Sequence, residues 1–417
     1  MKKRILAAVI AAVFAVLNVA SALPVFALNE STMRYPTPEG YNDHDYQKLV
    51  AFLEQTDDEG VKNGEKLSNN YDPNDPATWG TYRDFQWIES DGELRIQRID
   101  VYWCELCGTL DVSGCTALEY LECDHNNLTT LDVSGCTALT SLYCNYNNLT
   151  TLDVSGCTAL EYLFCYDNNL TELDVSNNTA LTRLGCGDNN LTELDVSSNT
   201  ALYWLECSSN NLTALDVSNN TALEGLDCSN NNLTELDVSN NTALTYLDCY
   251  NNNLTELDLS HNPYLPLDCV KSEGNGTIGY LWYEDDIGTD MFVQAVPNNG
   301  AEFVGWYNEA GELIASAEEC DFCDDSNAYE WYFLFTDETV LIAKFTEAEP
   351  IPGDADGDGE LTNEDVLLLM RAVMELEELT DEMLANCDMN GDGVVNFTDA
   401  LIMLRMVLNT QPNIAAC

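Results

Sequence analysis

The stretch Leu118-Glu-Tyr-Leu-Glu-Cys-Asp-His-Asn-Asn-Leu128 carries the pattern that decides the fold. The same pattern, L-x-x-L-x-C-x-x-N-N-L, returns every 21 residues, with its first leucine at Leu139, Leu160, Leu181, Leu202, Leu223 and Leu244. A fixed repeat of this length is typical of a solenoid, in which no turn can bury its apolar residues without its neighbours. The sequence therefore predicts a mainly β solenoid.

Each unit of the repeat contains one short strand and one turn. Leu121 and Cys123 alternate with Glu122 and Asp124 as in a strand, and Asn126 is a residue type that bends the chain. Rigid aromatic side chains concentrate binding energy at interfaces. The outward-facing aromatic residues of the strands therefore form a predicted ligand-binding face, made of Tyr120, Tyr143, Tyr162, Phe164, Tyr166, Trp204, Tyr246 and Tyr250. A protein ligand, a glycan stacked on the rings, and no ligand are the three hypotheses.

The repeats from roughly Ile96 to Leu265 resemble those of bacterial leucine-rich repeat proteins. The first unit has Cys104 where later units have Asn, and Pro266 interrupts the last, as expected of capping repeats. The string Ala-Val-Pro-Asn-Asn-Gly-x-x-Phe-Val-Gly-Trp that ends at Trp306 resembles small β-rich repeats that lie beside such solenoids in internalins. The resemblance implies a small β-rich domain that acts as a spacer or second cap.

Charge and the first residues bear on location. The net charge of -57 excludes nucleic acid and anionic lipid as natural partners, and fits cations, cationic protein patches or neutral glycans. Residues 1–27 have a basic start and an apolar run from Ile5 to Leu17, as in a secretory signal peptide, and the run is too short to span a membrane. We expect a soluble, secreted, extracellular protein without a membrane span.

The 17 cysteines are expected to be mostly free thiols. Seven of them recur at one inward strand position, where in-register neighbours lie about 4.8 Å apart, farther than a relaxed disulfide allows. We interpret them as a ladder of small hydrophobic side chains, which favours an anaerobic bacterial habitat. Cys104 with Cys107, and Cys320 with Cys323, remain candidates for a disulfide or a metal site.

Two loops near the C-terminus have the spacing of calcium sites, D-x-[DN]-x-D-G-x5-D, and begin 34 residues apart. Carboxylate, amide and carbonyl oxygens at positions 1, 3, 5, 7 and 12, with glycine at position 6, suit a hard cation. The sequence predicts two Ca²⁺ ions with these ligands: Asp354, Asp356, Asp358, Glu360, Asp365, Asp388, Asn390, Asp392, Val394 and Asp399. Thr362 and Asn396 occupy position 9, where a water would complete the shell.

Each loop runs into an apolar helix, lacks a preceding helix, and ends on Asp rather than Glu. In these features the segment Asp354–Leu408 resembles type I dockerins, which attach cellulosomal proteins to a cohesin module of a scaffoldin. The resemblance implies a near two-fold module that can meet cohesin through either half. The matching outward residues are Asn363, Glu364, Met370 and Arg371, and Phe397, Thr398, Leu404 and Arg405. Only Arg371 and Arg405 are identical, which argues against equal use of both halves.

The expected fold is a β solenoid with an N-terminal helical cap, a small β-rich domain and a C-terminal all-α dockerin. The helical cap follows from apolar residues at Tyr46, Leu49, Val50 and Leu53, and Phe85–Ile96 is expected to form a hairpin. An aromatic binding loop around Trp79 is a weaker hypothesis than capping. The division is signal peptide 1–27, cap 28–95, solenoid 96–269, β-rich domain 270–347, linker 348–353 and dockerin 354–417.

No sequence motif of a nucleophile, metalloprotease or other catalytic centre stands outside the repeats, and only three histidines exist. We therefore predict a secreted, non-catalytic accessory protein of a cellulosome-like complex. Its dockerin would bind a cohesin, and its solenoid would present a surface to an unknown protein or glycan. A cell-surface adhesin and a polysaccharide-active enzyme are the alternatives.

Overall fold

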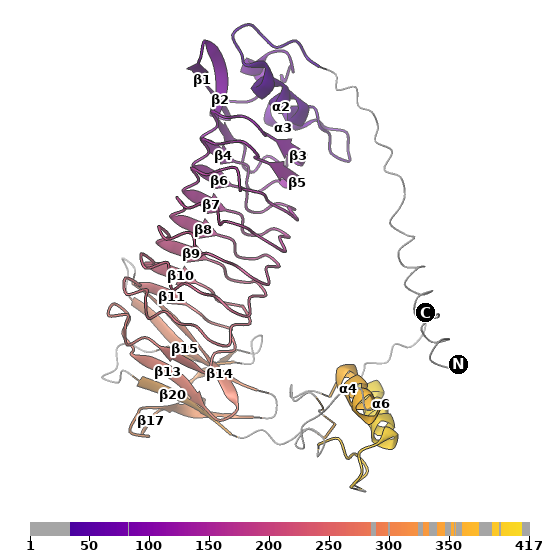
Figure 1. Cartoon of the computed structure of the whole chain (residues 1–417), viewed down its shortest axis with the longest axis vertical. Coiled ribbons are helices and arrows are strands. Elements are labelled where there is room, and N and C mark those ends of the chain that lie inside the picture. Colours follow the sequence, from indigo (N-terminus) through magenta and orange to yellow (C-terminus); the bar gives the residue numbers. More distant parts are fainter. Residues whose placement is uncertain are drawn as a thin grey trace. The chain divides into compact units, whose positions relative to one another are not determined.

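The computed structural model describes residues 34–81, 83–284, 289–298, 301–323, 328–332, 340–346, 352–353, 355, 361–374, 386–391 and 393–410 (Figure 1). The expected signal peptide and most of the expected linker lie outside these residues. Within them, no helix is long and apolar enough to cross a membrane.

Helix α2 (Asp43–Leu53) begins the N-terminal cap. Asn42 caps it by accepting a hydrogen bond from the Asp45 amide, and the predicted apolar positions are buried. The Gln55 side chain pairs with the backbone of Thr109, accepting at 2.8 Å and donating at 2.7 Å, so the helix packs over the edge of the first turn. Helix α3 (Asn63–Leu67) and the 3-10 turn η1 (Pro76–Thr78) follow. Trp79 is fully buried and donates to the Asp72 carbonyl, which contradicts a binding loop there.

A hairpin leads into the solenoid. Strands β1 (Phe85–Ser90) and β2 (Glu93–Asp100) are antiparallel. Asp91 and Gly92 join them with positive φ at both positions, the conformation that a tight hairpin turn requires. Strand β2 then pairs in parallel with the first repeat strand.

The repeats stack one parallel strand per turn, in register and in chain order (Figure 1). These strands are β4 (Tyr120–Glu122), β6 (Ser141–Tyr143), β7 (Tyr162–Phe164), β8 (Arg183–Gly185), β9 (Trp204–Glu206), β10 (Gly225–Asp227) and β11 (Tyr246–Asp248). On the opposite side only β3 (Cys107–Asp111) and β5 (Asn127–Asp132) pair, and β12 (Glu256–Asp258) belongs to another sheet. The leucines and cysteines at the inward positions form the core.

The described cysteines carry free thiols, as the sequence predicts. The strand ladder is fully buried, and burial raises the pKa of the Cys186 thiol to about 12. Cys104 contacts the Tyr102 carbonyl and Cys107 the Asn63 side chain, so this pair forms no disulfide. The side chain of Cys323 lies outside the described residues.

The β-rich segment continues the solenoid sheet. Strand β14 (Gly276–Glu284) pairs antiparallel with β11, and β15 (Thr289–Pro297), β19 (Ala328–Tyr332) and β18 (Asp321–Cys323) extend the sheet. A second sheet has the order β12, β13 (Cys269–Glu273), β20 (Val340–Phe345), β16 (Phe303–Tyr307) and β17 (Leu313–Ser316), and η2 (Ala317–Glu319) follows β17. The segment therefore covers the last open edge of the ladder.

Helices α4 (Asn363–Val373) and α6 (Phe397–Thr410) form the C-terminal module. They pack around one small core made of Ala355, Val366, Leu369, Cys387, Ala400, Met403 and Val407. The predicted architecture of solenoid, helical cap, β-rich segment and helical C-terminal module is confirmed.

Candidate functional site

The last residue of each predicted calcium loop is buried at the start of a helix. Asp365 accepts hydrogen bonds from the amides of Ala355, at 2.9 Å, and Thr362, at 2.6 Å. Asp399 accepts from the Asn396 amide at 2.9 Å through Oδ2. Its Oδ1 is buried and has no hydrogen-bond partner among the described residues. A buried carboxylate oxygen without a donor is costly, and a cation would supply what it lacks.

The second loop closes around Asp388. Its two carboxylate oxygens accept from the amides of Gly391, at 2.9 Å, and Gly393, at 2.8 Å. Gly393 has a φ of 78°, the left-handed conformation expected at position 6. Asn396 bonds the carbonyl of Val394, the predicted position 7 ligand, at 2.8 Å. These oxygens fit Ca²⁺.

The remaining predicted ligands Asp354, Asp356, Asp358, Glu360 and Asp392 lie outside the described residues. Asn390 is described and exposed, at position 3 of the second loop.

Most of the predicted cohesin-contacting residues lie on the exposed sides of α4 and α6. Asn363, Met370, Arg371, Phe397, Thr398 and Arg405 are exposed, and the side chain of Glu364 is not described. Leu404 is half-buried and packs against the core of the module, so it is less available than predicted.

Two exposed leucines were missed by the sequence reasoning. Leu367 and Leu401 are 51% and 50% exposed and stand 34 residues apart, the offset of the two calcium loops. That offset was the signal that could have found them. Together with Met370 and Phe397 they leave apolar area on both helices of the module.

The aromatic residues of the solenoid strands form a row of contacting rings. The Cζ atom of Arg98 lies 3.4 Å from the centroid of the Tyr120 ring. The ring centroids of Tyr120 and Tyr143 are 5.5 Å apart, and those of the stacked Tyr143 and Phe164 rings are 5.3 Å apart. A Cβ atom at Gly185 would lie 2.7 Å from Cδ1 of Phe164, so glycine makes room for that ring on the next strand.

The other predicted ligand-face aromatics have different surroundings. Trp204 stacks on Tyr246 at 5.3 Å, across Gly225, and Tyr162 is half-buried. Tyr250 packs on Phe292 at 5.5 Å and donates to Glu330, both in the β-rich segment. The Tyr250 ring therefore helps to hold that segment.

One Asp recurs in each unit on the side of the solenoid opposite the repeat strands, and its carboxylate has a structural role. In each unit the Asp accepts from the amide two residues later, as Asp195 does from Ser197 at 2.9 Å. The hydrogen bonds from Ser197 lower the pKa of Asp195. These Asp side chains therefore cap the turns.

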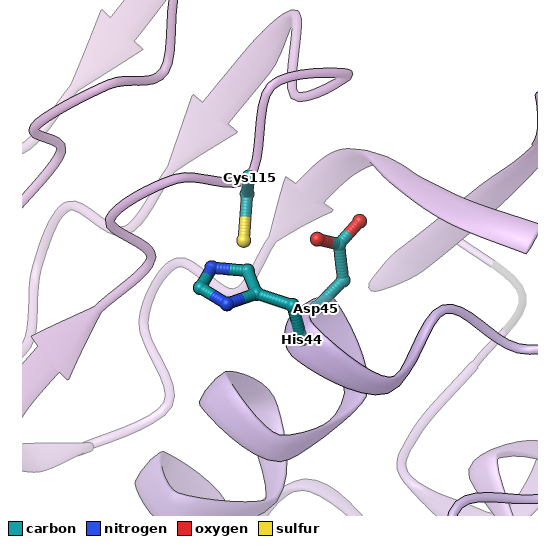
Figure 2. A group of neighbouring side chains, drawn as sticks. All are labelled: His44, Asp45 and Cys115. Atoms are coloured by element: carbon teal, nitrogen blue, oxygen red, sulfur yellow. The ribbon is translucent and has the colours of Figure 1, made fainter.

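One further cluster has metal-ligand chemistry. Figure 2 shows His44 and Asp45, both from α2, close to Cys115, with ligand atoms within 4.8 Å of one another. However, Arg95 donates to both Asp45 oxygens, at 2.8 and 3.1 Å, and the His44 Nε2 lies 2.7 Å from the Ser113 carbonyl oxygen. Burial raises the pKa of the Cys115 thiol. A metal ion at this cluster would face the Arg95 guanidinium, and both Asp45 oxygens already accept hydrogen bonds from it. The cluster therefore anchors α2 to the first turn of the solenoid.

The chain matches two protein families. The family described as "Dockerin type I domain" matches residues 352–408, and "Leucine Rich repeat" matches residues 229–247 and 250–263. Among curated proteins, none is significantly similar in sequence.

Several solved structures resemble parts of the chain. The functional domain of InlJ from Listeria monocytogenes, described as including a cysteine ladder, is 25% identical, with 63% of this chain and 69% of that chain covered and a TM-score of 0.40. The internalin InlF from the same organism is 26% identical, with 38% and 46% covered and a TM-score of 0.32. A leucine-rich repeat protein from Leptospira interrogans is 24% identical, with 34% and 45% covered and a TM-score of 0.31. The chain spans less than half the length of the latter two.

Type I dockerins are calcium-binding modules that attach to cohesins, and the matched segment includes both predicted loops, all of α4, and α6 as far as Leu408. The chain thus combines leucine-rich repeats with a C-terminal type I dockerin domain.

Proposed function

We propose that the chain is a secreted, non-catalytic accessory protein of a cellulosome-like complex. Its dockerin attaches it to a cohesin of a scaffoldin, and its solenoid presents a recognition surface. The observation that carries this proposal is the pair of loops ending at the buried carboxylates of Asp365 and Asp399, each continuous with a helix of one small core.

Two calcium ions order the dockerin in this proposal. The ligands are the ten residues predicted from the loop spacing. The buried Oδ1 of Asp399, which has no hydrogen-bond partner in the described part of the module, supports a cation in the second loop. Since a module with so small a core gains much of its folding free energy from metal binding, calcium removal should abolish attachment.

Cohesin contacts are proposed for the exposed residues of both helices, with Leu367 and Leu401 added to those predicted from sequence. Arg371 and Arg405 are equivalent by the 34-residue offset and both are exposed, so each half offers a cation beside an exposed leucine. Phe397 has Asn363 as its counterpart, which gives the second half the larger apolar contact.

A non-catalytic role is proposed because the carboxylates with clear partners serve structure. The Asp side chains of the turns cap backbone amides, and Asp45 holds Arg95. The described histidines include His44, which bonds a backbone carbonyl, and His125, which lies between two aromatic rings.

The test is binding of the full chain to a panel of immobilised cohesin modules, with calcium and after chelation. We expect at least one cohesin to retain the chain in calcium and to release it on chelation. The double variant Asp365→Asn/Asp399→Asn should lose binding, whereas Asp195→Asn/Asp216→Asn, which removes two carboxylates from solenoid turns, should keep it. Binding by none of the cohesins, or binding indifferent to calcium, would refute the proposal.

A further inference from the structure

One turn position in the solenoid has a left-handed backbone in every unit. In five later units it is occupied by small polar residues, namely Asp167, Asp188, Ser209, Asn230 and Asn251, with φ between 49° and 53°. In the first three units it is occupied by Trp103, His125 and Tyr146, with φ of 55°, 51° and 51°.

Two of these three residue types, Trp and Tyr, are poor choices for that conformation. Asn and Asp tolerate the left-handed region because their short side chains bond locally, whereas bulky residues rarely adopt it. Trp103 and Tyr146 therefore hold a less favourable backbone where the same chain elsewhere uses Asn or Asp. Strain of this kind clusters at functional sites.

The rings at these positions contact one another. The ring centroids of Trp103 and His125 are 3.9 Å apart, and those of the stacked His125 and Tyr146 rings are 4.0 Å apart. Tyr146 contacts Tyr166 edge-on, with 5.3 Å between the ring centroids. Trp103 is 69% exposed and Tyr146 is 41% exposed. We call these four residues the aromatic rim. A contiguous exposed aromatic patch, unlike a single exposed ring, indicates an interaction surface.

Acidic groups accompany the rim. The Asp124 Oδ2 lies 4.0 Å from the His125 Nε2. The Oδ1 atoms of Asp100 and Asp124 are buried without a hydrogen-bond partner among the residues that the structure describes. Between Ile99 and Val270 the sequence has Arg183 and no other Lys or Arg, and the whole chain carries -57. Charge complementarity therefore favours a cationic ligand.

The same surface already holds one cation. The Arg98 guanidinium lies 3.4 Å above the Tyr120 ring, 2.9 Å from Oδ2 of Asp100 and 3.6 Å from Oε2 of Glu122. This combination of ring and carboxylate is the arrangement in which a cation–π contact stabilises Arg or Lys. Rings lie beside a carboxylate at the rim as well, and the cation–π contacts of the described residues involve other rings, namely Tyr120, Tyr203 and Tyr307.

We propose that the aromatic rim binds Lys and Arg side chains of a basic segment of a partner protein. The proposal deepens the recognition role proposed for the solenoid and is independent of the dockerin. The net negative charge draws the segment towards the solenoid, and the exposed rings hold its cationic groups beside the Asp124 carboxylate.

The experiment measures fluorescence anisotropy of a labelled decapeptide of alternating Arg and Ser, titrated with the full chain at 150 mM salt. The variant Trp103→Asn/His125→Asn/Tyr146→Asn leaves the net charge unchanged, so non-specific attraction is retained. Because Asn occupies this position in later units, the variant should fold, with a Tm equal to or above that of the unchanged chain. We expect it to bind the peptide about tenfold more weakly, through loss of several cation–π contacts.

The matched control is Tyr264→Asn, which removes an exposed ring outside the rim and should change affinity less than twofold. Cellohexaose and a Glu-Ser decapeptide are the comparison ligands and should not compete with the basic peptide. Equal affinity of the triple variant and the unchanged chain would overturn the proposal, and so would rim-dependent binding of cellohexaose in place of the peptide. Cohesin binding measured on the same variants should remain unchanged, which separates this result from failure of the dockerin.

Discussion

Asn210 illustrates how single side chains hold the turns together. Its Nδ2 donates to the carbonyls of Cys186, at 3.0 Å, and Cys207, at 3.2 Å, and its Oδ1 accepts from the Leu191 amide at 2.9 Å. The groups it satisfies belong to its own turn and to the turn before it, so one amide joins two units. The equivalent Asn of other units repeats these bonds.

Asn210→Ala should destabilise the solenoid by ~2–4 kcal/mol, because it leaves buried backbone groups without partners. The neighbouring Asn211→Ala is the control, since the Asn211 side chain is exposed. Urea midpoints of the two variants provide the measurement. Similar midpoints would mean that Asn210 and the equivalent Asn residues of the other units do not stabilise the solenoid.

The carboxyl group of Asp248 should give the free energy of unfolding an unusual dependence on pH. Burial, and secondly the neighbouring Asp227, raise the pKa of Asp248 to about 7. In the unfolded chain an Asp releases its proton near pH ~3.9. The folded state therefore binds the proton more tightly, and this group lowers stability as pH rises from about 4 to about 7.

Asp248→Asn should remove that penalty. Relative to the unchanged chain, the variant should gain on the order of 2 kcal/mol more at pH 8 than at pH 4.5. Thermal unfolding at both pH values measures the difference. Asp237→Asn is the control, and its effect should have the opposite sign. Hydrogen bonds from Ser239 lower the pKa of Asp237, so this carboxylate stabilises the fold at pH values above the pKa that Asp237 has in the unfolded chain. A pH-independent effect of Asp248→Asn would contradict the account.

At the scale of elements, the repeat strands, the calcium loops and strand β14 show what a local pattern can and cannot predict. The repeat strands were predictable because the alternation of Leu121 and Cys123 recurs, and the calcium loops because glycine and carboxylates recur at fixed positions. The antiparallel pairing of β14 with β11 was not predictable. It joins Leu247 to Trp282, and no sequence repeat relates the two segments that contain them.

The same limit applies to the candidate sites. The strand aromatics, Tyr166 of the rim among them, were predicted from alternation. The other three rim residues were missed because the pattern does not reveal that Trp103, His125 and Tyr146 share a left-handed turn. Leu404 was predicted to be outward, yet it packs on the dockerin core, since the packing of α4 against α6 decides which side of the helix is covered.

The two dockerin helices should contribute unequally to cohesin binding. Leu401→Ala should weaken binding more than Leu367→Ala, because Phe397, 51% exposed, offers more apolar contact beside Leu401 than Met370, 37% exposed, offers beside Leu367. A loss of roughly tenfold against roughly threefold is expected for contacts of this size. Isothermal titration with a cohesin that binds the unchanged chain provides the measurement. Equal losses would favour equal use of both halves.

At the scale of the whole molecule, stability has two different sources. The solenoid is stabilised by repeated burial of leucines and cysteines between a helical cap and an antiparallel sheet. The dockerin has a small core and a buried carboxylate oxygen that accepts no hydrogen bond from the described residues, so its folding should depend on metal. Under the proposed function, this division would let the dockerin attach to a cohesin while the repeats stay folded for recognition.

Hydrogen exchange of the intact chain, with calcium and after chelation, tests this division most directly. The account predicts that amides of α4 and α6 are strongly protected in calcium and exchange rapidly without it, while amides of β4 through β11 keep the same protection in both states. Equal protection of α4 and α6 with and without calcium, or loss of protection in the repeat strands on chelation, would contradict it.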